Sequence, residues 1–468
     1  MSEIPTIAEA AKLIAARKLS PVELTRACLD RVNELDGELH SFLLLTEEKA
    51  LADARAAEVA IMAGNPVGPL HGIPIGLKDI VDTKGIRTTC HSKILRDNIP
   101  DTDATCAVKL AEAGTVLMGK TATHEFADGG PSFDLPWPPA RNPWNTAHFT
   151  AGSSSGTGAG VAAGLILGGI GTDTGGSIRG PAALCGIAGI KPTYGVVSRA
   201  GVAPAAFTLD HIGPMAWTAE DCALMLQALA GHDPRDPASA SRPIPNYTAQ
   251  LGAGIKGMRI GVIHHFHEVD HKVSDGTQRG IDAAIATFRS LGAEISEVTL
   301  SPLHDWHACG TLISLTERAA AYDEWARTRL GDFSACVQQR LLLGAMVSGV
   351  DYVQALRRRR ELPAELQAAM AGLDVVLTAA QPQEAPTIDS VPDWDVGQKP
   401  GFTMPFNVAG YPAMSICSGF GEGDLPVAIQ LVGKPFQEPA LFRIADAFEQ
   451  ATPFRDRRPV LSAVPVAA

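Results

Sequence analysis

Two clusters of glycine and serine carry the clearest chemical potential in this sequence: Gly152-Ser-Ser-Ser-Gly156 and Gly175-Gly-Ser177. Glycine permits positive φ angles and close approach of other atoms to the backbone. Successive N–H groups in such a turn form a concave anion site, and a serine hydroxyl beside that site can act as the nucleophile of acyl transfer. Two other interpretations stay open, a packing turn and a phosphate loop, although no GxxxxGK[ST] pattern occurs here.

A lysine near the end of an apolar run is the second chemical feature. The run spans residues 71–82 and is predicted to be a strand, with Lys78 followed by Asp79. Either Lys78 is a surface or ion-paired residue, or it is buried and its pKa falls far enough for the neutral amine to act as a base. Because adjacent strand residues point to opposite faces, Asp79 need not neutralise Lys78.

Four motifs occur in order along the chain. They are Gly-Ile-Pro-Ile-Gly-Leu-Lys-Asp at 72–79, Gly-Ser-Ser at 152–154, Gly-Thr-Asp-Thr-Gly-Gly-Ser at 171–177 and Gly-Ile-Lys-Pro-Thr-Tyr-Gly at 189–195. Further matching segments are 402–412 and 426–433. Through these motifs, most of the chain closely resembles the amidase signature family.

The resemblance implies a Ser–cis-Ser–Lys triad and neither a cofactor nor a metal. Carried onto this sequence, it makes Ser177 the nucleophile, Ser153 the bridging serine and Lys78 the base. It also implies an oxyanion hole of backbone amides, from Thr174, Gly175, Gly176 and Ser177. Four residues are expected to support the site: Gly152, Ser154, Asp173 and Arg179.

Within the family, the main rival to a free-standing amidase is the glutamine-hydrolysing component, the A subunit, of a tRNA-dependent amidotransferase. That component typically carries an Ala-Glu-Ala-Ser-Ser-type helix where this chain has residues 310–325, and an acidic residue where this chain has Gly401. We therefore expect a free-standing amidase that hydrolyses C–N acyl bonds of linear amides or carbamates. A catalytically silent binding subunit is the alternative from another class, and the intact Lys78, Ser153 and Ser177 argue against it.

Composition bounds the remaining possibilities. The chain has 468 residues, 46% of them hydrophobic, with a net charge of −12. The negative charge disfavours a broad surface for nucleic acid or anionic membrane, and no signal peptide or long apolar span is evident. Eight scattered cysteines fit reduced thiols. We expect a cytoplasmic monomer or homodimer whose partner is a small-molecule amide or carbamate, with no nucleic acid and no membrane.

Two further segments invite functional interpretations. Residues 123–144 are rich in proline and aromatic residues and are predicted to form an ordered loop over the site. There, Phe126, Phe133 and Trp137 either line an apolar substrate pocket or pack within the loop. The segment His264–His271 contains four histidines, but it lacks a strict metal-ligand pattern, so a solvated loop is favoured over a metal site.

Alternating helix and strand signals predict an α/β fold in one domain, residues 1–468. The expected architecture is an α/β/α sandwich around a mixed central sheet. Residues 1–65 are assigned to an N-terminal helical layer, 66–235 and 372–468 to the catalytic core, and 236–371 to a mostly helical excursion.

Overall fold

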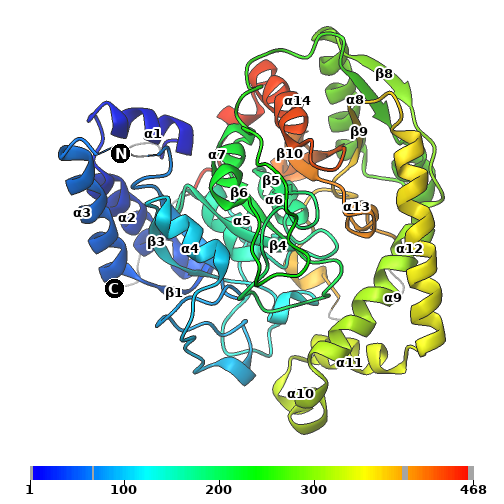
Figure 1. Ribbon diagram of the computed structural model, residues 1–468, viewed down its shortest axis with the longest axis horizontal. Coiled ribbons are helices and arrows are strands. Elements are labelled where there is room, and N and C mark those ends of the chain that lie inside the picture. The colour runs from blue at the N-terminus through cyan, green and yellow to red at the C-terminus, as the bar shows by residue number, and fades with distance from the viewer. Residues whose placement is uncertain (1–3, 66–67, 393–398, 462–468) are drawn as a thin grey trace.

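The computed structural model describes residues 4–65, 68–392 and 399–461. Eleven strands within these ranges form one sheet in the order β1-β3-β2-β4-β6-β5-β10-β11-β9-β7-β8 (Figure 1). The strands are β1 (Phe42–Leu45), β2 (Pro74–Lys78), β3 (Val116–Thr121), β4 (Gly168–Asp173), β5 (Ala188–Lys191), β6 (His211–Ala216), β7 (Arg259–Val262), β8 (Glu294–Glu297), β9 (Val375–Ala379), β10 (Ala413–Phe420) and β11 (Pro426–Gly433).

The sheet is mixed, as predicted. Strand β2 runs parallel to both β3 and β4, and β7 runs parallel to β8 and β9. Between these two parallel parts, the pairs from β4 to β9 are antiparallel. Helices pack around this sheet (Figure 1), which confirms the predicted fold class.

Fourteen α-helices occur in the described ranges. They are α1 (Ile7–Ala15), α2 (Pro21–Leu39), α3 (Glu47–Met62), α4 (Thr105–Glu112), α5 (Ser155–Ala162), α6 (Arg179–Cys185), α7 (Ala219–Leu229), α8 (Asp275–Ser290), α9 (Leu303–Ala321), α10 (Asp323–Thr328), α11 (Ala335–Met346), α12 (Gly349–Ala369), α13 (Met404–Ala409) and α14 (Glu438–Ala451). Local sequence signals position several of them. Thr6 and Ser20 form capping boxes at the starts of α1 and α2.

The stretch 236–371 supplies helices α8 to α12 and also two strands. Strand β7 pairs with β9, and β8 extends the same sheet by one more strand. Helices α9, α11 and α12 form an arm at one side of the molecule (Figure 1). The assignment of the whole chain to one domain stays a prediction, which this continuous sheet supports.

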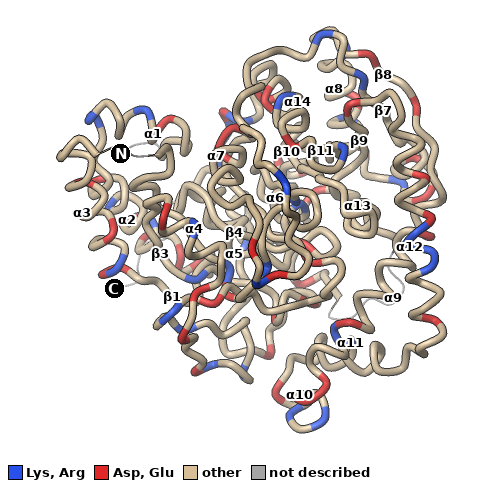
Figure 2. The backbone as a smooth tube through the Cα atoms, in the orientation of Figure 1, with Lys and Arg blue, Asp and Glu red and all other residues tan. Residues whose placement is uncertain are grey.

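Charged positions of both signs are interspersed over the outer helices. Figure 2 shows basic and acidic positions side by side on α10 and α12. On α12, Arg358 pairs with Glu361 and with Asp305 of α9. Across the described ranges, none of the helices combines the length and apolar character that a bilayer crossing requires.

The parallel strands β2 and β4 position the candidate site. Lys78 is the last residue of β2, and Asp173 is the last residue of β4. Because the two strands are parallel neighbours, their carboxyl ends open at the same edge of the sheet. The loops that contain the two glycine–serine clusters lead directly into α5 and α6, so both clusters can reach that edge.

Candidate active site

Lys78 lies in a completely buried pocket of hydroxyl groups. Its Nζ atom is 2.6 Å from Ser153 Oγ, 3.1 Å from Ser154 Oγ and 2.8 Å from Thr172 Oγ1. All three of these partners are neutral. The structure therefore brings two of the three expected triad residues, Lys78 and Ser153, into direct hydrogen-bonding contact.

The surroundings of Lys78 favour its neutral form. Burial lowers the pKa of Lys78 to about 7, because the ammonium loses its hydration, and the more distant charges of Asp173 and Asp210 oppose this only in part. A substantial fraction of the amine is consequently unprotonated near pH 7. Such an amine can accept a proton, which an exposed lysine at its usual pKa of about 10.4 does poorly.

Ser153 follows a cis peptide bond, Gly152–Ser153. A histidine that the sequence analysis did not single out packs beside this bond. The backbone N–H of His124 donates to Ser153 O at 3.1 Å, and its Nδ1 lies 2.9 Å from Gly129 O. A Cβ atom at position 152 would overlap the His124 ring, so this position requires glycine. Burial lowers the pKa of His124 to about 3, which keeps the ring neutral.

Ser177 is linked to the hydroxyl cluster through the backbone of Ser154. Its side chain is only partly buried, and in the described part of the chain its hydroxyl makes no hydrogen bond. The Ser177 carbonyl accepts a 3.2 Å hydrogen bond from the Ser154 N–H. The loop that carries Ser177 is thus joined to the loop that carries Ser153, and the Ser177 hydroxyl is left available to a substrate.

The loop before Ser177 is organised around a buried carboxylate. Asp173 accepts hydrogen bonds from the N–H groups of Gly176 at 2.8 Å and Ile178 at 3.2 Å. The Gly176 amide is therefore engaged inside the protein and not directed at a substrate oxygen. Of the four backbone amides that the resemblance assigns to the oxyanion hole, those of Thr174, Gly175 and Ser177 remain as candidate donors to a substrate oxygen.

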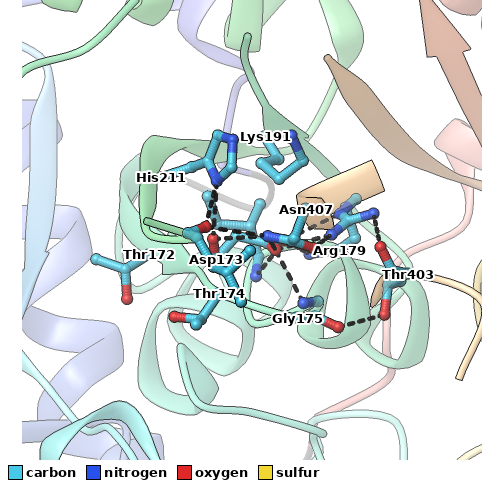
Figure 3. A network of polar contacts seen from close by, with 12 residues as sticks. Thr172, Asp173, Thr174, Gly175, Arg179, Lys191, His211, Thr403 and Asn407 are labelled. Atoms are coloured by element: carbon cyan, nitrogen blue, oxygen red, sulfur yellow. Dashed lines mark hydrogen bonds and ion pairs between the residues drawn. The ribbon is translucent and has the colours of Figure 1, made fainter. Parts of the chain in front are cut away.

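Arg179 fixes Asp173 and ties the loop to distant parts of the chain. Its guanidinium donates to both Asp173 oxygens, at 2.8 and 2.9 Å. It also donates at 2.5 Å to Asn407 Oδ1 and to Gln430 Oε1 (Figure 3 shows the Asn407 contact). Burial alone would raise the pKa of Asp173, but the guanidinium outweighs it and holds that pKa well below its usual range. Asp173 and Arg179 are thus a buried, charged brace.

The outer side of the loop is held by Thr403. Its Oγ1 donates to Gly175 O at 2.5 Å, and its carbonyl accepts from Arg179 at 2.9 Å (Figure 3). Thr403 and Asn407 lie in the distal segment 402–412, and Gln430 lies in 426–433. Both segments match the family in sequence, but their motifs alone gave no indication that these side chains reach the Ser177 loop.

A cavity of about 210 Å³ borders this hydroxyl network. Its lining includes Thr172, which accepts from Lys78, and Asp210, which accepts from Thr174 Oγ1 at 2.5 Å. Arg199 and Arg235 also line it. The cavity thus meets the lysine pocket at Thr172, a feature that sequence spacing did not indicate.

The three aromatic residues expected over the site do not form one pocket. Phe126 is 1% exposed, and its ring packs against Tyr322 and Phe333. Phe133 is 52% exposed, and Trp137 makes an edge contact with the ring of His91. Phe126 therefore packs inside the protein and does not line a substrate pocket, because aromatic rings from the segments just after α9 and just before α11 enclose it.

The histidine-rich segment is not simply a solvated loop. Residues Phe266–Asp270 form a π-helical turn. Potential metal-ligating atoms of His264, His267 and Glu268 lie within 4.8 Å of one another, and His267 is completely buried. Among the described residues, this is the group that could hold a metal ion, and it lies outside the lysine–serine site.

Comparison with known proteins identifies the family. The model of the family described as Amidase matches residues 23–442. Since this match covers most of the chain, the protein belongs to the amidase signature family, and it is an enzyme of the class that hydrolyses C–N bonds.

Relatives and solved structures match over almost the full length. The A subunit of glutamyl-tRNA(Gln) amidotransferase from Chloroflexus aggregans is 40% identical, over 98% of both chains. The native peptide amidase of Stenotrophomonas maltophilia superposes with a TM-score of 0.85 at 32% identity, over 97% of this chain and 98% of that one. A chain from a vestigial protein complex, related to the origins of an s-triazine catabolic enzyme, superposes at 0.90 with 30% identity, over 95% and 98%.

These relatives correct one expectation. We expected a free-standing amidase rather than the A subunit of an amidotransferase, and that distinction is wrong, because curated relatives at 40% identity are named as A subunits. The two sequence differences from the A-subunit pattern that led to this expectation are each confined to one short segment. Residues 310–325 lie mainly in the single helix α9, and Gly401 is one loop residue. The expectation of a monomer or homodimer agrees only in part with these relatives, because they are named as subunits.

Proposed function

We propose that the chain hydrolyses carboxamides through an acyl-enzyme on Ser177, with Ser153 as the proton relay and Lys78 as the base. The observation that carries this proposal is the 2.6 Å contact between Lys78 Nζ and Ser153 Oγ, in a pocket where Ser154 and Thr172 supply two further neutral hydroxyl partners. The partly exposed Ser177, whose carbonyl accepts a hydrogen bond from the Ser154 N–H, supplies the nucleophile, and the free amides of its loop supply donors for the oxyanion.

The reaction follows from these positions. Ser177 Oγ attacks the amide carbon while its proton passes to Ser153, whose own proton passes to neutral Lys78. The carbonyl oxygen becomes an oxyanion facing the loop amides. When the C–N bond breaks, the proton returns through Ser153 to the departing nitrogen, which leaves as ammonia or an amine. A water molecule then attacks the acyl-enzyme and gives its proton to the same relay. This step releases the acid from Ser177.

For the substrate, we propose the side-chain amide of glutamine, with the ammonia passed to a partner that acts on charged tRNA. The near-complete coverage by relatives named as A subunits of glutamyl-tRNA(Gln) amidotransferase supports this choice over an aryl amide, a peptide amide or a carbamate. The partner protein would then be another component of such a complex.

Two measurements test the two parts separately. The first is labelling with a fluorophosphonate, read by mass spectrometry, on the wild type, Ser177→Ala and the control Ser155→Ala. Ser155 belongs to the same glycine–serine cluster as Ser153 but donates away from the pocket, to Ala122 O at 3.4 Å. We expect the wild type and the control to be labelled at Ser177. Labelling at another serine in all three proteins would exclude Ser177 as the nucleophile.

The second measurement is ammonia or amine release from glutamine, an aryl amide, a peptide amide and a carbamate. We expect the highest kcat/KM for glutamine and loss of that activity in Ser177→Ala. A higher kcat/KM for any of the other three would overturn glutamine as the substrate, while the role of Ser177 would stand.

A further inference from the structure

A turn directly after strand β7 gathers three potential metal ligands. Strand β7 ends at Val262, and the chain then enters a helical turn whose residues 266–270 are π-helical. Side chains three and four positions apart on a helical turn lie on one side of it. His264, His267 and Glu268 have this spacing, and their ligand atoms lie within 4.8 Å of one another.

The distances between the potential ligand atoms of these three residues are close to those expected for atoms that bind one metal ion. His264 Nδ1 lies 2.9 Å from Glu268 Oε1, and His267 Nε2 lies 3.9 Å from the same oxygen. With zinc bonds of about 2.0–2.2 Å, two ligand atoms in tetrahedral geometry lie about 3.3–3.6 Å apart. Small side-chain rotations therefore suffice to direct all three atoms to one ion.

The buried histidine gives an independent reason to place a ligand here. His267 is 0% exposed, and in the described part of the chain its Nε2 has no hydrogen-bond partner, although it is directed at Glu268. Its other nitrogen, Nδ1, lies 3.5 Å from Thr378 Oγ1 on strand β9. A buried polar atom without a partner is costly, and a ligating histidine commonly has its second nitrogen held by a neighbouring polar group.

The state of the His267 ring suits this role. Burial lowers the pKa of His267 to about 4, so the ring is neutral at pH 7. A neutral imidazole presents a lone pair to a metal. The other two members remain accessible, since His264 is partly exposed and Glu268 is exposed, so an ion can enter from solvent.

We propose that His264, His267 and Glu268 bind one divalent transition-metal ion of the zinc type. Two imidazole nitrogens and one carboxylate oxygen suit Zn²⁺ better than Mg²⁺ or Ca²⁺, which prefer oxygen ligands. Three protein ligands leave the fourth position to water. This site goes beyond the proposed amide hydrolysis, whose proton path does not pass through it.

The site would anchor a turn that adjoins the framework of the active site. Thr378, beside His267, is the register partner of Gln430 on strand β11. Gln430 in turn accepts a hydrogen bond from Arg179, the residue that braces the Ser177 loop. An ion bound to His267 would therefore lie close to β9, next to the strands that hold the Ser177 loop.

The test uses the full chain, stripped with a chelator and then titrated with Zn²⁺ by calorimetry and with Co²⁺ by visible absorption. The variants are His264→Gln and Glu268→Gln, both at accessible positions. The control is His304→Gln, which removes an exposed histidine of α9 outside the trio. Melting curves in metal-free buffer show whether each variant folds like the wild type.

We expect the wild type and His304→Gln to bind one equivalent of Zn²⁺, with affinity at least tenfold lower in each trio variant. The Co²⁺ complex should show the absorption of a four-coordinate site without a thiolate charge-transfer band, which separates it from binding to the eight cysteines. The proposal is overturned if the wild type binds no Zn²⁺, if both trio variants keep wild-type affinity, or if the thiolate band appears.

Discussion

Two buried lysines on adjacent strands show how the surroundings of a side chain decide its use. Lys78 ends β2 and Lys120 lies in β3, where the parallel register places Leu77 opposite Lys120. Both side chains are completely buried. The two amines therefore share residue type, burial and sheet but differ in what surrounds them.

The difference lies in the counter-ion. Lys120 Nζ lies 3.5 Å from Asp79 Oδ1 and donates at 2.6 Å to Val81 O and Thr88 Oγ1. Burial lowers the pKa of Lys120, and Asp79 opposes that fall, whereas the hydrogen-bond partners of Lys78 among the described residues are three hydroxyl groups. Since adjacent residues on a strand face opposite ways, Asp79 serves Lys120 and leaves its neighbour Lys78 unpaired. Lys120 is held as a structural group beside a carboxylate, and Lys78 is available as a base.

The sharpest test of this comparison is to replace each lysine by methionine. Lys78→Met should reduce kcat by roughly 10²–10⁴-fold while the protein folds, because a general base is removed. Lys120→Met should instead lower the free energy of unfolding by about 3–5 kcal/mol, because Asp79 keeps its hydrogen bonds from Thr89 but is left buried without a counter-ion. Amide hydrolysis and urea denaturation measure the two effects. If Lys120→Met lost kcat at unchanged stability, the two roles would not be separate.

The two serines next to Lys78 offer a finer comparison. Both accept a hydrogen bond from its Nζ, Ser153 at 2.6 Å and Ser154 at 3.1 Å. Ser153→Ala should interrupt the relay and reduce kcat by roughly 10²–10³-fold. Ser154→Ala removes one hydrogen bond to Lys78, which corresponds to about 1 kcal/mol, or about fivefold. Steady-state kinetics on one amide decide this, and equal losses in the two variants would contradict a relay through Ser153.

The pH dependence of activity should report Lys78 and not Lys120. As pH rises through the pKa of Lys78, about 7, the neutral base forms, so kcat/KM should rise about tenfold per pH unit below that value and then level off. Lys78→Arg keeps the charge but cannot deprotonate, and should be inactive at every pH. The measurement is a profile from about pH 5 to 10. An active Lys78→Arg enzyme would remove Lys78 from the base role.

Local signals in the sequence predicted much of the fold, but not how its parts meet. The capping boxes at Thr6 and Ser20 act within one turn, so residues close together in the sequence are enough to start these two helices. The order of the sheet depends on contacts between distant segments. Strands β10 and β11, near the end of the chain, lie between β5 and β9, and nothing in the spacing of their residues indicates this.

The same division applies to the site. The motifs selected the segments that carry Lys78 and Ser153, and the structure adds the contact between these two residues. The commitment of the Gly176 amide to Asp173 was not foreseen, because a motif identifies a loop but not which of its N–H groups remain free. Phe126 could not be assigned from sequence either, since the residues that bury it, Tyr322 and Phe333, lie far along the chain.

The last expected effect is a change in how stability depends on pH. The pKa of Lys78 is about 7 in the folded protein and about 10.4 when exposed on unfolding. Between these values the unfolded chain binds the extra proton, so this group makes the free energy of unfolding rise with pH, by up to about 1.4 kcal/mol per unit. Below pH 7, Lys78 is protonated in both the folded and the unfolded protein. The buried charge then lowers the free energy of unfolding by its full amount.

Lys78→Met removes that contribution. The variant should therefore be more stable than the wild type at pH 6, and its advantage should shrink as pH rises from 7 toward 10. Urea denaturation of both proteins at matched pH values gives the difference, in which other titrating groups cancel, including Glu449, whose burial raises its pKa to about 8. A difference that stays constant with pH would mean that Lys78 is no more costly to protonate than an exposed lysine, and the contrast with Lys120 would lose its electrostatic basis.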